Sequence, residues 1–267
     1  MAVLELKIIT EDGDVIVCSK ADNFVDLVYS KAYEPGMEIL LHSDTYPVFL
    51  NIQLDDGIQA GIVYLTNDLR YPIPFGEKRA NLSPKAFDGN LHYLHVSALS
   101  KDQLPSVRNL ACNPYDISVG GNAVSAWPHT YANIETRNET VFAARNAIDG
   151  VKANSFHGQW PYTSWGINRR PDAEFHLEFG RIVEVNHIVI YTRADFPHDS
   201  WWMEGKITFS NGDTICFPLE KSCYGQRIDF TSKRITGLTL HSLVKADDPS
   251  PFPALTQIEV YGKEIEE

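Results

Sequence analysis

Residues 192–205, which read TRADFPHDSWWMEG, carry more reactive side chains than a connection between two strands usually does. They follow the apolar run VNHIVIYT, and they bring together an arginine, a histidine, two aspartates and two adjacent tryptophans. Carboxylate, imidazole and guanidinium groups can hydrogen-bond to a ligand or move protons, and an indole can stack on an apolar surface. Turns are normally small and polar. The stretch therefore indicates a ligand-binding or catalytic loop.

Two further long loops have a related composition, at 150–172 and 243–254. Four of the five tryptophans of the chain lie in the loops 150–172 and 193–205, which favours a binding face on a rigid scaffold. The candidate ligand-binding residues are Trp160, Trp165, Arg193, Asp195, His198, Asp199, Trp201, Trp202, Lys245 and Asp247. The indoles among them are candidate stacking platforms, and the charged groups are candidate polar contacts.

The elements that must position these loops are short strands. In AEFHLEFG, for example, Phe175, Leu177 and Phe179 share one face, while His176 lies on the other face between two glutamates, as in a half-buried antiparallel strand. His187 and His241 are likewise interpreted as strand residues rather than ligands. The expected strands are 173–180, 184–192, 206–210, 214–219, 226–230, 235–243 and 255–262.

If these strands run antiparallel in sequence order, successive connections alternate between the two ends of a sandwich. The short turns 180–184, 211–213 and 231–234 then share one end. The loops 150–172, 193–205, 220–225 and 243–254 share the other end. The count therefore predicts that the three long loops meet.

The first hundred residues also consist of strand-like runs bounded by turn signals such as Asp12-Gly13 and Asp56-Gly57. The sequence SKDQ, at Ser100–Gln103, has the spacing of a capping box and predicts one short helical turn there. We therefore expect an all-β fold of two β-sandwich domains, residues 1–104 and 105–264, with no assigned role for the first.

Composition narrows the classes of function. The chain has 267 residues and a formal net charge of −12, with no cluster of lysine and arginine, which argues against nucleic acid as a partner. No apolar run approaches 18 residues, so no membrane span is expected. The start of the sequence lacks the pattern of a secretion signal, and the four cysteines lack zinc-binding spacing. We expect a cytoplasmic protein with free thiols.

Several segments, taken in order, resemble the galactose-binding-like jelly roll, the fold of discoidin and coagulation-factor C-type domains and of many carbohydrate-binding modules. The resemblance rests on FAARNAIDG, AEFHLEFG, VNHIVIYTR, ITFSNGD and ALTQIEVYG, and it covers about residues 109–262. It implies that the C-terminal domain is an eight-stranded sandwich whose ligand face lies on loops at one end. The class of ligand is left open, because such domains bind sugars, lipid head groups or proteins.

The resemblance also implies a structural calcium ion. In such modules calcium commonly joins the loop after the AIDG segment to the last strand, and the matching carboxylates here are Asp149 and Glu259. Carbonyl groups of residues 146–155 would complete a shell of six to eight oxygens. The sequence departs from the family pattern at Val151, where a further acidic residue often stands.

Carbohydrate binding fits these residue types best, with a glycan or a sugar-containing small molecule as the partner, because sugars offer an apolar face to indoles and hydroxyls to polar groups. A carbohydrate-active hydrolase is the alternative, using a cluster of His157, His198, Asp199, Asp247 and Asp248. The sequence contains no HExxH, GxSxG or GxGxxG motif to support it. A non-catalytic protein-interaction module is the third hypothesis.

Overall fold

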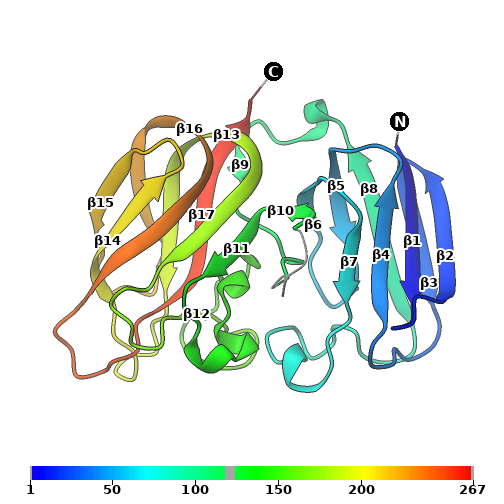
Figure 1. The fold of residues 1–267 in the computed structure, drawn as a ribbon. Helices are drawn as coiled ribbons and strands as arrows, with labels where there is room; N and C mark the ends of the chain where they lie inside the picture. Colours follow the sequence, from blue (N-terminus) through cyan, green and yellow to red (C-terminus); the bar gives the residue numbers. More distant parts are fainter. Residues whose placement is uncertain (1, 118–123, 266–267) are drawn as a thin grey trace. The chain divides into compact units, whose positions relative to one another are not determined.

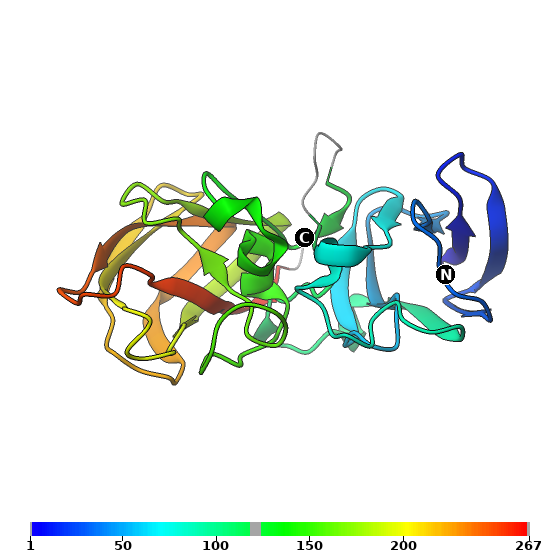
Figure 2. The same cartoon turned by 90° about the horizontal axis from the view of Figure 1, so that it is seen from below.

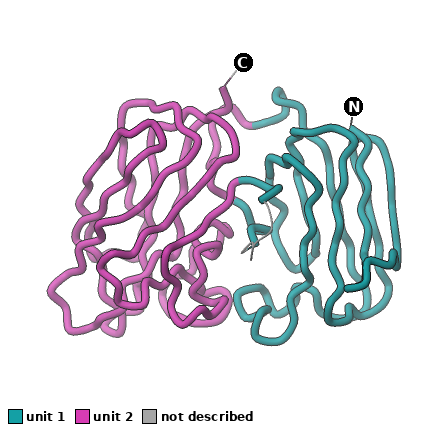
Figure 3. Tube along the Cα trace, in the orientation of Figure 1, with its two compact units in different colours: residues 1–104, 113–127 teal, residues 105–112, 128–267 magenta. Residues whose placement is uncertain are grey.

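The computed structural model describes residues 2–117 and 124–265, and it divides the chain into two compact units (Figures 1 and 3). The first unit comprises residues 1–104 and 113–127, and the second comprises 105–112 and 128–267. Residues 113–127 thus differ from the predicted division, which placed them in the C-terminal domain. They belong to the first unit because Ala126 and Trp127 pair with Leu65 and Tyr64 at a sheet edge. None of the described residues forms a helix with the length and apolarity to cross a membrane.

The first unit is a β-sandwich, as predicted. Its strands are β1 (Val3–Ile9), β2 (Val15–Asp22), β3 (Phe24–Tyr29), β4 (Glu38–Ser43), β5 (Val48–Gln53), β6 (Gly61–Leu65), β7 (Leu69–Pro72), β8 (His92–Leu99) and β10 (Ala126–Trp127). They form a four-stranded sheet in the order β2-β1-β4-β7 and a five-stranded sheet in the order β10-β6-β5-β8-β3. Two short 3₁₀ helices accompany them, Gly76–Arg79 and Lys101–Gln103.

The alternation of the sequence explains the core of this unit. In β1, Leu4, Leu6 and Ile8 are fully buried, and the residues between them are partly exposed. The predicted helical turn near residue 100 is confirmed, since Ser100 and Gln103 form both hydrogen bonds of a capping box.

The second unit is also a β-sandwich. Its strands are β9 (Arg108–Asn109), β11 (His129–Ala132), β12 (Trp165–Gly166), β13 (Phe175–Thr192), β14 (Trp202–Phe209), β15 (Thr214–Pro218), β16 (Gln226–Lys245) and β17 (Ala254–Glu264). Three 3₁₀ helices precede β12, at Thr136–Asn138, Thr140–Phe142 and Ala144–Ile148. All strand pairs in this unit are antiparallel.

The long strands β13 and β16 belong to both layers of this sandwich. The N-terminal half of β13 pairs with β11, whereas its C-terminal half pairs with β17. β16 pairs with β13 between residues 226 and 240, whereas its C-terminal half pairs with β14. Figure 1 shows both strands curving over one end of the unit. Strands that pass from one sheet to the other in this way define a sandwich of the jelly-roll type.

This curvature corrects two of the predicted turns. Residues 180–184 and 231–234 do not separate strands; they are bends within β13 and β16, and the register between the two strands shifts twice there. Gly180 lies at the bend with φ +68°, a conformation that a side chain disfavours. The third predicted turn, 211–213, is a tight hairpin between β14 and β15. Both ends of β13 consequently lie at the same end of the unit, as the count of connections required.

Glu264 joins three segments of the second unit. Its carboxylate accepts hydrogen bonds from Arg108 (2.7 Å) and Arg181 (2.6 and 2.8 Å), so it connects β17 to β9 and to the bend of β13. Burial alone would raise the pKa of Glu264, but the two guanidinium groups outweigh this effect and hold its pKa below the ordinary value of 4.5. The carboxylate is therefore more stable ionised in the folded protein than in the unfolded chain.

We predict that Glu264→Gln lowers the free energy of unfolding at pH 7 by about 1–3 kcal/mol, because two largely buried guanidinium groups lose their counter-charge. A group with a lowered pKa contributes stability above pH ~4.5 that is lost as the pH falls through its folded-state pKa. The difference between variant and wild type should therefore shrink toward pH 3. Urea titrations at both pH values measure it, with Glu204→Gln on an exposed part of β14 as the control. A difference that is independent of pH would contradict the assignment.

Candidate ligand-binding site

The three long loops meet at one end of the second unit, as predicted (Figure 2 looks onto this end). A cleft of about 440 Å³ lies between them. Its lining residues are Thr136, Arg137, Phe142, His157, Gly166, Ile167, Asn168, Arg169, Arg193, His198, Pro251, Phe252, Pro253 and Ala254. These residues come from all three loops and from the 3₁₀ segment that precedes them. The β-sandwich therefore brings together, around one cavity, residues that are distant from one another in the sequence.

Arg193 and Asp199 form the buried base of this site. Asp199 is fully buried, and the Arg193 guanidinium donates a hydrogen bond to its Oδ1. The same guanidinium donates to the Phe252 carbonyl (2.9 Å), and the Arg193 backbone N–H donates to the Ala254 carbonyl (3.0 Å). The pair therefore fixes the loop 193–205 against the loop 243–254. Both residues were predicted to contact the ligand. Arg193 lines the cleft, whereas Asp199 is not part of the lining and supports Arg193 instead.

A column of planar side chains crosses the loops beside the cleft. The rings of His157 and His198 stack with centroids 4.3 Å apart and planes within 5°, and His198 stacks in turn on Phe252 at 5.5 Å. The Arg169 guanidinium lies 4.7 Å from the centroid of Phe252. Stacked rings and cations over rings each contribute stabilisation beyond area burial. The column therefore links three loops through side chains.

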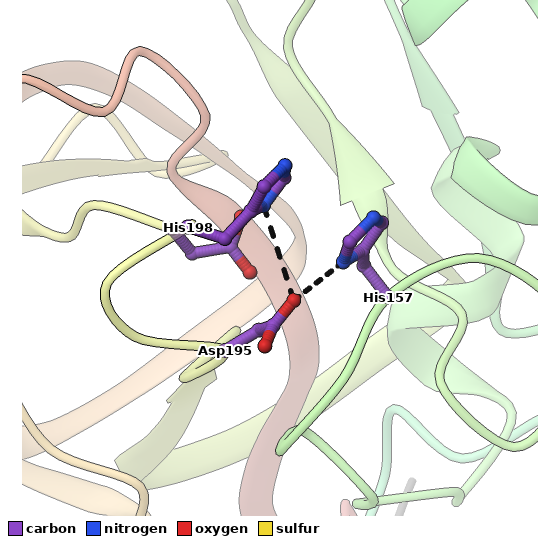
Figure 4. A group of neighbouring side chains, drawn as sticks. His157, Asp195 and His198 are labelled. Carbon is purple, nitrogen blue, oxygen red and sulfur yellow. Dashed lines mark hydrogen bonds and ion pairs between the residues drawn. The ribbon is translucent and has the colours of Figure 1, made fainter.

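Asp195 holds the two imidazoles (Figure 4). Its Oδ2 lies 2.5 Å from His157 Nδ1 and 3.9 Å from His198 Nδ1. His198 Nδ1 also lies 3.2 Å from Asp199 Oδ1. These four residues group enough ligand atoms for a metal ion. The lone pair of an imidazole lies in the ring plane, however, so two nearly parallel stacked rings do not direct both Nδ1 atoms at one ion. As they lie, the rings fit hydrogen bonding to Asp195 better than shared metal coordination.

The backbone around the cleft contains an unusual concentration of left-handed residues. Arg137 and Asn138 have φ of 54° and 53°, and Asn168 and Arg169 have φ of 48° and 60°. This conformation is unfavourable for residues other than glycine, and such outliers cluster at functional sites when the surrounding structure holds them. Three of the four residues line the cleft. These three residues place polar side chains at the cleft while their backbone is held in an energetically unfavourable conformation.

Two of the predicted tryptophan platforms are core residues instead. Trp165 is fully buried in β12, packs against the tilted ring of Phe175 and donates a hydrogen bond from Nε1 to the Ile134 carbonyl (2.9 Å). Trp202 is 1% exposed, because β14 begins at this residue and turns its side chain into the sandwich. Neither indole can stack on a ligand in this structure. Both close the loop end of the hydrophobic core.

The other predicted contacts lie outside the cleft lining. Trp160 is 37% exposed, and Trp201 is partly buried beside Phe196 and Lys221. The Lys245 ammonium donates to the carbonyls of Ala246 and Asp248, and so stabilises its own loop. Asp247 is exposed. Of the predicted set, only Arg193 and His198 line the cleft, with Asp195 and Asp199 supporting them.

Sequence reasoning missed five lining residues that matter for chemistry, namely Arg137, Phe142, Asn168, Arg169 and Phe252. Three of them stood inside predicted loops but were passed over in favour of the tryptophans. A partial signal was available in the Asn168-Arg169 pair, since asparagine tolerates the left-handed backbone found there. Arg137 and Phe142 precede the predicted loops and gave no such signal.

The two carboxylates expected to bind calcium have other partners. Glu259 Oε1 lies 2.5 Å from the Lys152 ammonium. Asp149 Oδ1 accepts a hydrogen bond from the Val151 N–H (2.8 Å) and faces the Gln257 amide nitrogen at 3.3 Å. Burial raises the pKa of Asp149 to about 7. A calcium ion needs oxygen ligands, and here an ammonium and an amide N–H₂ approach these carboxylates. The groups that surround these two carboxylates do not fit a calcium ion. The calcium site therefore stays an untested prediction, and this geometry does not favour it.

No protein-family model matches this chain, and no curated protein matches it. Solved structures do match, and three of them are carbohydrate-binding modules.

One is chitosan-binding module 1 of a chitosanase/glucanase from Paenibacillus sp. IK-5, at 19% identity over 58% of this chain and 99% of that one, with a TM-score of 0.38. A fucose-binding module from Streptococcus pneumoniae matches at 16% identity over 59% and 99%, with a TM-score of 0.42. The family 32 carbohydrate-binding module of NanJ from C. perfringens matches at 17% over 49% and 91%, with a TM-score of 0.38.

The burial of the indoles gives a direct test. We predict that Trp165→Ala and Trp202→Ala each lower the free energy of unfolding by about 3–5 kcal/mol, because each leaves a large core cavity. Trp160→Ala should change it by less than ~0.5 kcal/mol, as for a surface substitution. Equilibrium unfolding in urea measures all three. Equal stability losses in the three variants would mean that Trp160 is also a core residue.

The calcium geometry gives a second test. We predict that a chelator leaves the melting temperature unchanged, because Lys152 already supplies the positive charge beside Glu259. Differential scanning calorimetry with and without chelator measures this, and elemental analysis of purified protein checks for the metal. A melting temperature that falls with chelator and recovers with added calcium would restore the ion implied by the family resemblance.

Proposed function

We propose that this chain is a carbohydrate-binding protein and that a sugar ring occupies the cleft at the loop end of the second unit. The single observation that carries this proposal is the lining of the cleft, which joins an apolar wall to a set of fixed hydrogen-bond donors. Sugar pockets combine these two features, because a pyranose presents C–H groups on its faces and hydroxyls around its edge. The resemblance of the sequence to galactose-binding-like domains is compatible with this class of ligand, because sugars are among the ligands that such domains bind.

The apolar wall would receive the C–H groups of the sugar. Phe142 and Ile167 lie on one stretch of the lining, and Phe252 lies between Pro251 and Pro253 on another. Prolines restrict the backbone before binding, which lowers the entropy lost when the loop is ordered by a ligand. The wall is thus rigid as well as apolar.

The polar side of the cleft would receive the hydroxyls. Arg193 is 4% exposed, and its Nε has no hydrogen-bond partner within the described structure. A buried donor without a partner is costly, so pairing it with a ligand oxygen would be favourable. Asn168 adds an amide, and the two histidines add ring nitrogens. Arg193 and the two histidines are held by Asp195 and Asp199, which reduces the ordering cost further.

The hydrolase alternative has less support. Glycoside hydrolysis normally uses two carboxyl groups that flank the scissile bond. Among the described residues that line the cleft, none is an aspartate or glutamate. Asp195 and Asp199 are engaged by His157 and Arg193.

The test begins with a glycan array on the intact chain and continues by calorimetric titration with the best ligand. We predict that Phe252→Ala weakens binding by about 1–3 kcal/mol, as for loss of an aromatic anchor. Trp160→Ala is the matched control, because this aromatic residue lies outside the cleft. Melting temperatures of both variants should stay close to wild type, which separates lost contacts from lost folding. Weakened binding in Trp160→Ala alone would move the site to the loop that carries this indole, and an array without any bound glycan would refute the proposal.

A further inference from the structure

We infer that the sugar bound in this cleft is acidic, carrying a carboxylate or a sulfate ester that pairs with Arg169. This inference rests on the proposed function and specifies its class of ligand. It starts from a contrast of charge. The whole chain has a formal net charge of −12, whereas every lining residue of the cleft with a titratable side chain is an arginine or a histidine.

The carboxylates near the cleft are placed behind these basic groups. Glu139 binds Arg137 through two hydrogen bonds of 2.5 and 2.7 Å. Asp195 binds His157, and Asp199 binds Arg193. None of the three acids is among the lining residues. A ligand would therefore meet donors and positive charge first, with the compensating negative charge farther away.

Arg169 differs from the other two arginines of the lining. Arg137 and Arg193 each have a carboxylate partner, whereas Arg169 forms no ion pair with a described residue. Its guanidinium packs over the ring of Phe252 at 4.7 Å. A guanidinium stacked on a ring keeps the N–H groups on its edge available, and these match the two oxygens of a carboxylate or sulfate in a bidentate pair.

The backbone supports a positioning role for this segment. Asn168 and Arg169 are consecutive left-handed residues, which is unfavourable for two side chains in succession. The Asn168 backbone N–H donates to the Thr136 hydroxyl (2.9 Å), and the Arg170 N–H donates to the Ile167 carbonyl (2.9 Å). The turn is therefore held by neighbours on both sides. It places an unpaired guanidinium and an amide at the same edge of the cleft.

Arg193 is a second, independent indication of a ligand with oxygens to offer. It is more than nine-tenths buried, lines the cleft, and leaves its Nε without a hydrogen-bond partner in the described structure. An acidic pyranose could give a hydroxyl to Arg193 while its acid group meets Arg169. Because the acid group carries the charge, the preference for acidic over neutral sugars would depend on Arg169 rather than on Arg193.

The experiment compares neutral and acidic sugars that otherwise match. Methyl glycosides of galactose and galacturonic acid, of glucose and glucuronic acid, and of N-acetylglucosamine and its 6-sulfate are titrated into wild-type protein. In at least one pair the acidic sugar should bind about 5–10-fold more tightly, and the preference should fall as sodium chloride is raised. Arg169→Gln should abolish the preference while leaving affinity for the neutral partner within about twofold.

Arg170→Gln is the matched control. This neighbouring arginine is exposed, is paired with Asp172, and lies outside the lining. It should retain the full preference. Neutral sugars that bind as well as their acidic partners would overturn the inference and leave the proposed function intact. A preference that survives in Arg169→Gln would overturn the assignment to this residue, and failure of every sugar to bind would instead refute the proposed function.

Discussion

The loop end of the second unit depends on one buried ion pair. Asp199 has no contact with solvent, and an ionised carboxylate in that position requires a positive partner. Arg193 supplies it and also binds the carbonyl of Phe252, so the charge requirement of one loop fixes the path of another. Removing Asp199 would leave the buried Arg193 guanidinium without its counter-charge, and removing Arg193 would leave the buried Asp199 carboxylate with His198 alone. The cleft therefore owes its shape to a polar interaction rather than to hydrophobic packing alone.

The pair acts on loops that the sandwich has already gathered. β13 and β16 bend over the opposite end of the unit and return, so the chain leaves and re-enters each long strand at the same end (Figure 1). Antiparallel pairing of residues 175–190 of β13 with residues 226–240 of β16 makes this arrangement rigid. The long connections can then vary in sequence without disturbing the core, which Trp165 and Trp202 close from within. Rigid strands and adaptable loops are the usual division of labour in binding domains.

Within the cleft, the groups that would touch a ligand are held by groups that would not. Asp195 orients His157, Glu139 engages Arg137, and Phe252 supports Arg169. Acidic side chains thus serve as supports in a chain of strongly negative charge, while basic side chains reach the surface of the cavity. The charge of the groups that line the cleft is therefore positive, whereas the net charge of the whole protein is negative. Long-range electrostatic attraction consequently contributes little to the binding of an acidic ligand. Specificity would arise from short-range pairing.

The class of fold, the position of most strands and the meeting of the three long loops could be predicted from the sequence alone. Alternation with a period of two assigns the faces of a strand locally, and counting antiparallel connections assigns the loops to ends. The sequence also pointed to Arg193 and His198, two of the residues that line the cleft. The folded chain was needed to learn that Trp165 and Trp202 are core residues, that residues 113–127 join the first unit, and that Arg169 and Phe252 share a cleft. Whether a loop side chain is buried depends on neighbours distant in sequence, and no local pattern records them.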